Sequence, residues 1–174
     1  ETYANGAQYI SIFLTPATVS LAVPLYRQLE LLKTYPKAIF GGIIAGVLTA
    51  MVSVFAFSLM FVLNHEQYET LLPKAITTAI GMGISEKMGG IVTITVVVII
   101  VTGILGNILA ETICRLCKIE DPIAKGLAIG TSAHALGTAK AMELGEIEGA
   151  MSSLSIVVCG ILTVISVSIF ANFI

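Results

Sequence analysis

Long runs without a charged residue alternate with short charged clusters along this chain of 174 residues. The uncharged runs cover residues 2–26, 38–65, 88–110 and 149–174. An α-helix needs about 20 mainly apolar residues to cross the hydrocarbon core of a bilayer, so each run is long enough to cross. The pattern therefore predicts an all-α integral membrane protein, a multi-span helical bundle with one transmembrane domain over residues 1–174.

Four crossings are expected, and the first differs from the other three. It covers Tyr9–Tyr26 and contains Pro16 and Pro24. Because a proline inside a helix removes an intrahelical hydrogen bond, we expect this segment to be broken or kinked. The remaining crossings are predicted as uninterrupted helices. They cover Ala38–Leu63, Met88–Ala110 and Gly149–Ile174.

Composition agrees with a membrane protein and excludes one large class of function. Hydrophobic residues make up 56% of the chain and charged residues only 11%, whereas soluble proteins carry about 25% charged residues. A water-soluble globule of this size could not bury four such apolar segments. The formal net charge of −2 provides no basic face for nucleic acid.

Two further segments, Leu71–Gly90 and Gly126–Ala139, are too polar and glycine-rich for clean crossings and too apolar for aqueous loops. The first contains Pro73 and has only a short uncharged stretch between Lys74 and Glu86. Inside a bilayer, non-helical backbone persists only where protein or a water-filled cavity satisfies its polar groups. We therefore expect both segments to be broken, re-entrant elements that surround a cavity.

The basic residues predict how these elements are oriented, because loops rich in Lys and Arg face the cytoplasm. Two basic loops flank the second and third crossings, so both loops lie inside and Leu71–Gly90 enters and leaves on the outer side. Gly126–Ala139 starts from the inner side, and we expect the two segments to meet near the midplane. The basic residues are Arg27, Lys33 and Lys37 in the first loop and Arg115, Lys118 and Lys125 in the second.

Weak internal similarity also suggests a repeat. Thr77-Thr78-Ala79 aligns on Thr131-Ser132-Ala133, whereas Gly46–Thr49 resembles Gly160–Thr163 at a different offset. The two offsets cannot both mark one duplication, and such matches also arise by chance in chains rich in Gly and Ala. Paired interrupted segments nevertheless point to transporter binding sites within inverted repeats, so an inverted repeat is one interpretation.

Hydroxyl residues gather in the interrupted segments beside glycines. Exposed amides at the start of a half-helix favour an anion, particularly beside a Thr or Ser hydroxyl, so we predict a site for a small organic anion. The alternative is that each hydroxyl caps or donates to its own helix. The candidate substrate-binding residues are Thr15, Pro16, Thr77, Thr78, Gly81, Gly83, Thr131, Ser132, His134, Gly137 and Thr138.

His134 is the one histidine within an apolar stretch. An ionisable group at membrane depth is a functional candidate, and an imidazole that titrates near neutrality suits proton coupling. The alternative is a neutral imidazole that bridges two helices by hydrogen bonds. Both interpretations remain open at this point.

The sequence offers little for a metal, a cofactor or enzyme chemistry. His65, Glu66 and Glu69 lack the second histidine of a zinc-binding HExxH motif. Cys114 and Cys117 form a CxxC pair with no second pair to complete a zinc site. No phosphate-binding loop, nucleophile motif or paired carboxylates are present, so we expect no metal, no cofactor and no enzyme activity.

Three stretches of the chain resemble a known family. FLTPATVSLAVPLYRQ (Phe13–Gln28), LLPKAITTAIGMGISEKMGGI (Leu71–Ile91) and DPIAKGLAIGTSAHALGTAKAMELGEIEGA (Asp121–Ala150) resemble the LrgB/CidB family of bacterial antiholin-like membrane proteins. Plastidial glycolate/glycerate translocators carry a similar domain. The resemblance covers essentially the whole chain and implies a multi-pass protein of the bacterial plasma membrane.

The resemblance also implies further features. Additional N-terminal membrane helices are expected before Glu1, and a holin-like LrgA/CidA-type membrane protein is the expected partner. Thr15 stands where relatives often carry Gly or Glu, and Ala139-Lys140 stands where small or proline residues occur in some relatives. These departures bear on substrate identity.

Two functions from different classes follow. The favoured interpretation is a carrier or facilitator of small monocarboxylates of the pyruvate, lactate or glycolate class, with proton coupling through His134. The alternative is an antiholin-like regulator of murein hydrolase export and cell lysis. Such a regulator would associate with a holin through small-residue stripes such as Gly42/Gly46. A homodimer is a further expectation.

Overall fold

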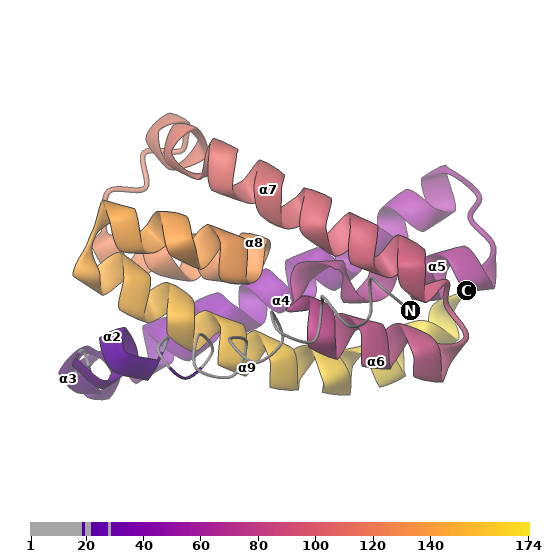
Figure 1. Cartoon of the computed structure of the whole chain (residues 1–174), viewed down its shortest axis with the longest axis horizontal. Coiled ribbons are helices and arrows are strands. Elements are labelled where there is room, and N and C mark those ends of the chain that lie inside the picture. Colours follow the sequence, from indigo (N-terminus) through magenta and orange to yellow (C-terminus); the bar gives the residue numbers. More distant parts are fainter. Residues whose placement is uncertain (1–18, 20–21, 28) are drawn as a thin grey trace, which may run out of the picture.

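The computed structural model describes residues 19, 22–27 and 29–174, and this part of the chain contains helices and no strands. Figure 1 shows the helices packed side by side as an elongated bundle. The elements are α2 (Ala22–Arg27), α3 (Leu29–Thr34), α4 (Pro36–Met60), α5 (His65–Leu71), η1 (Leu72–Ala75), α6 (Thr78–Met88), α7 (Val92–Leu116), α8 (Pro122–Leu144), α9 (Glu146–Phe170) and η2 (Ala171–Phe173).

Three helices of the described part are long and apolar enough to cross a membrane, namely α4, α7 and the stretch from α9 through η2. They confirm the second, third and fourth predicted crossings, although the third begins later and ends later than expected. Its start shifts because Gly89 adopts a φ of 89° and ends α6. Its end lies later because the helix continues past the apolar run through Glu111 and Arg115, which pair on its surface at 3.0 Å. The expected first crossing, with Pro16, lies largely outside the described residues.

The α8 helix is a hairpin whose two arms lie beside the same end of α9. A Cβ atom on Gly126, in the first arm, would lie 2.5 Å from the carbonyl oxygen of Glu148. A Cβ atom on Gly149 would lie 2.8 Å from Cγ of Met142, in the second arm. Both arms can contact the first turn of α9 only because the backbone of α8 reverses at His134, which has φ 42° and ψ −133°. Figure 1 shows α8 confined to one half of the bundle.

A second hairpin, formed by α5, η1 and α6, enters from the opposite end. Its outer end is fixed to the start of α7, where the Thr95 hydroxyl lies 2.9 Å from the carbonyl oxygen of Thr70 and 2.7 Å from Oγ of Ser85. The chain reverses after η1, at Ile76 and Thr77, which have extended backbone. The structure thus contains the two re-entrant elements that the sequence predicted, and they enter from opposite ends.

The distribution of charge identifies the two ends of the bundle. Of the nine Lys and Arg residues, all of which the structure describes, Lys87 alone belongs to the end with α5 and the C-terminus of α9. Lys74 lies inside the bundle on η1. Positive residues concentrate on the cytoplasmic side of membrane proteins, so we expect the α8 end to be the cytoplasmic end. It carries Arg27, Lys33, Lys37, Arg115, Lys118, Lys125 and Lys140.

The same order of elements occurs twice with opposite direction. The α4 helix runs parallel to the first arm of α8, because Gly42 lies beside Leu127 and Gly46 beside Thr131. The α7 helix runs antiparallel to that arm, because Gly106 lies beside Ala133 whereas Gly103 lies further along, beside His134. Each crossing helix, α4 and then α7, is followed by a re-entrant hairpin that enters from the end at which that crossing finishes.

The sequence alignment of the two hairpins nevertheless paired the wrong positions. Thr77-Thr78 lies at the start of the returning arm, whereas Thr131-Ser132 lies at the end of the entering arm of α8. The reversal at His134 is the position equivalent to the reversal at Thr77. The similarity therefore reflects shared small and hydroxyl residues near both tips and not equivalent structural positions.

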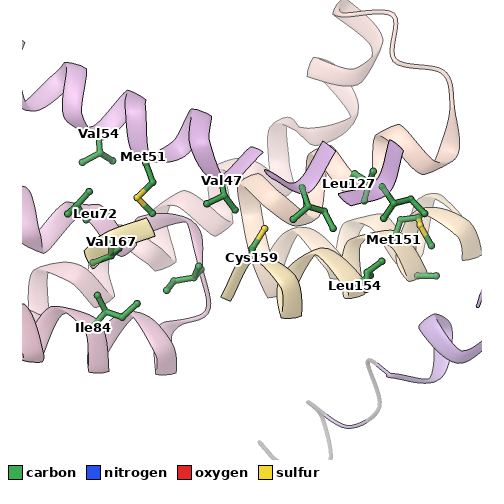
Figure 2. Close-up of a cluster of buried hydrophobic side chains, with 14 of the residues drawn as sticks. Val47, Met51, Val54, Leu72, Ile84, Leu127, Met151, Leu154, Cys159 and Val167 are labelled. Carbon is green, nitrogen blue, oxygen red and sulfur yellow. The ribbon is translucent and has the colours of Figure 1, made fainter. Parts of the chain in front are cut away.

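The hydrophobic core lies between α4, the outer hairpin and α9. Figure 2 shows Met51 of α4, Leu72 of η1, Ile84 of α6 and Val167 of α9 within this buried cluster. Further apolar side chains on α4, α7 and α9 are exposed along the outside of the bundle, as expected for surfaces that contact lipid.

Membrane topology can be tested with single cysteines in a variant that lacks Cys114, Cys117 and Cys159. Cysteines at Glu66 and Lys87 should both react with a membrane-impermeant maleimide added outside intact cells, and cysteines at Glu120 and Glu143 should both be protected. The expectation follows because each pair flanks one re-entrant hairpin. Opposite accessibility within either pair would show that the hairpin crosses the bilayer.

The contact between α8 and α9 predicts a destabilising substitution. A Cβ atom on Gly130 would lie 2.6 Å from the carbonyl oxygen of Ser152, and backbone atoms cannot yield as a flexible side chain can. Gly130→Ala should therefore lower the free energy of unfolding by about 1–3 kcal/mol, measured by thermal unfolding in detergent. The matched control is Gly83→Ala on α6, where the new methyl group meets no atom within 4 Å. Gly83→Ala should leave the free energy of unfolding unchanged or raise it by up to about 1 kcal/mol. Equal losses of stability in Gly130→Ala and Gly83→Ala would contradict the packing described.

Candidate functional site

A groove of about 1030 Å³ lies between α4 and α8 and leads from the cytoplasmic end towards the tips of the two hairpins. Tyr35 and Asp121 line its cytoplasmic part, and Lys74 and Ser132 line its deep part. Beyond the hairpin tips the bundle is filled by buried side chains such as Tyr68. The groove therefore ends at the hairpin tips, and exposed residues such as Thr49 and Ser132 line it.

Small residues on the facing surfaces of α4 and α8 create this groove. Gly42, Ala45 and Gly46 of α4 and Ala128 of α8 line it and occupy little space. A Cβ atom on Gly46 would lie 2.7 Å from Oγ1 of Thr131, so the two helices meet at this point. The Gly42/Gly46 stripe thus faces α8 within the chain, and Gly42 is exposed in the groove.

Lys74 is the charged residue at the deep end of the groove. It belongs to η1, just before the tip of the outer hairpin, and is half-buried. Among the described residues, no carboxylate lies within ion-pair distance of its ammonium group. The other charged residue that lines the groove is Asp121, which caps the start of α8 through a 2.9 Å bond from the amide of Ala124. A cation held in apolar surroundings without a partner is costly, so Lys74 favours a bound anion.

The hydroxyl groups of the groove donate to their own helices. Ser132 donates to the carbonyl oxygen of Ala128 at 2.7 Å, and Thr131 donates to the same oxygen at 3.2 Å. Thr49 and Ser53 make equivalent bonds on α4. Their hydrogens are therefore engaged in this structure, and their oxygens offer acceptor positions to the groove. Lys74 supplies the donors.

His134 connects the inner hairpin to α7. Its Nε2–H donates to the carbonyl oxygen of Ile99 at 3.1 Å, and its side chain is buried. The positive φ at this reversal costs about 1–3 kcal/mol, which contacts with α7 offset. Asn107 contributes one of them by donating to the carbonyl oxygen of Leu136 at 2.7 Å. His134 occupies the helix-bridging position and is not among the residues that line the groove.

The other predicted site residues lie around the two tips and not in the groove. Thr77 and Thr78 begin α6, whose first amides have no side-chain cap. Gly81 packs against the side chain of Ile99. Gly83 faces open space on the exposed side of α6.

Within the inner hairpin, Gly137 packs against Ile129 and Ala133 of the entering arm. Thr138 donates to the carbonyl oxygen of His134 at 2.9 Å and pairs with Oγ of Ser152 at 2.7 Å. Both residues therefore hold the two arms and α9 together. Thr15 and Pro16 lie outside the described residues.

Comparison with known proteins identifies the family. The LrgB-like family matches residues 1–173 of the chain. Antiholin-like protein LrgB of Bacillus cereus (strain B4264) is 40% identical over 174 residues, which are 100% of this chain and 76% of that protein. The protein of the same name from Bacillus anthracis (strain A0248) has the same identity and coverage. This chain belongs to the LrgB-like family. No solved structure matches it.

Lys74 is the residue of this LrgB-like site that sequence reasoning missed. The candidate list favoured glycines and hydroxyls, and Lys74 served only to mark one end of an uncharged stretch. The sequence did contain an indication of its role. Lys74 lies between Pro73 and Thr77, within an interrupted segment that was already expected to lie inside the membrane. Of the predicted residues, Thr131 and Ser132 line the same groove as Lys74.

Access to the groove can be measured with thiol reagents. In a variant without native cysteines, Ser132→Cys should react with a small charged methanethiosulfonate reagent, because Ser132 is exposed in the groove. Reaction should be faster from the cytoplasmic side by about tenfold or more. Thr138→Cys, fully buried between the arms and α9, is the control and should stay unmodified. Labelling of Thr138→Cys, or equal labelling of Ser132→Cys from both sides, would contradict the geometry of the groove.

Proposed function

We propose that this LrgB-like protein is a carrier or facilitator of small organic anions in the bacterial plasma membrane. The observation that carries the proposal is that two oppositely directed re-entrant hairpins converge at the deep end of a groove. The groove contains a lysine that has no ion-pair partner among the described residues. Interrupted helices from inverted halves form substrate sites near the midplane in many secondary transporters. A pore formed by simple helix association has no need for these features.

The chemistry of the deep end of the groove favours a small monocarboxylate of the pyruvate, lactate or glycolate class. The groove is mainly apolar and its deep end is narrow because Gly46 and Thr131 approach closely. Lys74 provides one positive charge there. Hydroxyl oxygens of Thr131 and Ser132 offer acceptors for polar substituents or for water.

Proton coupling through His134 is part of this proposal. His134 is buried at the tip of the inner hairpin and bonded to Ile99 of α7. A change in its protonation at Nδ1 would alter the charge at the tip while Nε2–H continued to donate. The bond to Ile99 thus allows protonation to affect how the hairpin packs on α7.

An antiholin-like regulator is the second candidate, and the names of the relatives favour it. In this function the chain would associate with a holin-like LrgA/CidA-type partner or with a second copy of itself. The lipid-facing surfaces of α4, α7 and α9 would provide the contacts. Such a role would not depend on Thr131 or on the interior of the groove.

Uptake by purified protein in liposomes distinguishes the two candidates. Wild-type protein should accumulate labelled pyruvate, lactate or glycolate, and Thr131→Val should reduce the initial rate by about tenfold or more, because the groove loses a polar group. His134→Ala should reduce the rate as well, and thermal unfolding in detergent checks that this variant keeps its fold. Ser168→Ala, which removes an exposed hydroxyl of α9 far from the groove, is the control and should retain uptake. An absence of uptake by wild type, with a holin-like partner also present, would favour the regulator.

A further inference from the structure

We propose that Lys74 is the counter-charge that binds the anionic group of the substrate and makes the site selective for singly charged anions. This inference rests on the proposed carrier function and assigns its charge selectivity to one residue. Two features placed side by side suggest this role. Lys74 is a half-buried lysine at the tip of the outer hairpin, and it lines the same groove as Thr131 and Ser132 of the inner hairpin.

The backbone of Lys74 lies deep within the bundle. Lys74 follows Pro73 in η1, and both Pro73 and Ala75 are buried, so the backbone here is fixed deep within the bundle. A lysine near a helix end can extend its ammonium group to the membrane surface, but Lys74 begins at the innermost part of the hairpin. It lines the groove instead.

Lys74 and Asp121 are the charged residues that line the groove, and most of the first arm of α8 separates them, because Asp121 caps the start of that arm. Asp121 therefore does not neutralise the deep end. One bound monoanion would neutralise it, whereas a dianion would leave an uncompensated negative charge in an apolar site. A neutral analogue would leave Lys74 itself uncompensated.

Hydrogen bonding also favours an anion beside Lys74. An ammonium group has three donors and no acceptor, and a carboxylate has only acceptors. The hydroxyl hydrogens of Thr131 and Ser132 are directed to the carbonyl oxygen of Ala128. Lys74 is thus the donor available to an anion at this depth, and the hydroxyl oxygens can accept its remaining hydrogens.

The test uses full-length protein in liposomes with labelled lactate as the probe. Lys74→Gln removes the charge and retains a similar length, and Lys74→Arg keeps the charge. Lys87→Gln is the matched control, because Lys87 belongs to the same hairpin but is exposed at its outer end. The initial rate should fall by about 100-fold in Lys74→Gln, remain above about a tenth of wild type in Lys74→Arg, and change by less than about twofold in Lys87→Gln.

Competition provides a readout that a merely structural role would not affect. In wild type and Lys87→Gln, unlabelled lactate should inhibit uptake more strongly than its neutral amide or the dianion malonate. Binding can also be measured as the rise in unfolding temperature that lactate causes in the detergent-solubilised protein. In Lys74→Gln this rise should fall to the value caused by the neutral amide of lactate. Undiminished lactate uptake or an unchanged lactate preference in Lys74→Gln would overturn the assignment of Lys74. Absence of transport by wild type would instead overturn the proposed function.

Discussion

The fold depends on satisfying the backbone polar groups where the inner hairpin reverses within the bilayer. Lipid cannot supply hydrogen bonds, so such a reversal survives only if the protein provides them. Asn107 of α7 satisfies one of these backbone groups by donating to the carbonyl oxygen of Leu136. The side chain of His134 fixes the turn against α7, because its Nε2–H donates to the carbonyl oxygen of Ile99. Together with the Thr138 hydroxyl, which donates to the carbonyl oxygen of His134, these bonds stabilise the turn between the entering and returning arms of α8.

The α7 helix therefore acts as the common support for both hairpins. The outer hairpin is attached to it by the buried hydroxyl cluster of Thr70, Ser85 and Thr95, and Gly81 packs against Ile99. The inner hairpin is attached to the same residue through His134. Another surface of α8 lies beside α4. The groove forms between these two helices because small residues line both of them.

Hydropathy and charge predicted much of this architecture. Three crossings, two re-entrant segments and their opposite directions follow from apolar run length and from the positions of Lys and Arg, because bilayer thickness and orientation are encoded locally in the sequence. Helix ends were less predictable. Gly89 ended α6 by a left-handed turn, and the Glu111–Arg115 pair extended α7 beyond its apolar run.

The candidate site was harder to predict because residue type does not determine the direction of a side chain. Thr131 and Thr138 look alike in the sequence, yet one lines the groove and the other bonds between the arms and α9. Gly81 packs at the tip and Gly83 faces away, since neighbouring positions on a helix point in different directions. Lys74 was overlooked because its depth depends on where the outer hairpin reverses.

The central claim, that the two hairpin tips meet inside the bilayer, can be tested by chemical cross-linking in membranes. In a variant without native cysteines, a short bis-maleimide should link cysteines placed at Lys74 and Ser132, one from each hairpin. It should not link cysteines at Lys87 and Ser132, because Lys87 lies at the outer end of its hairpin. Efficient linking of the Lys87 pair together with no linking of the Lys74 pair would contradict the account.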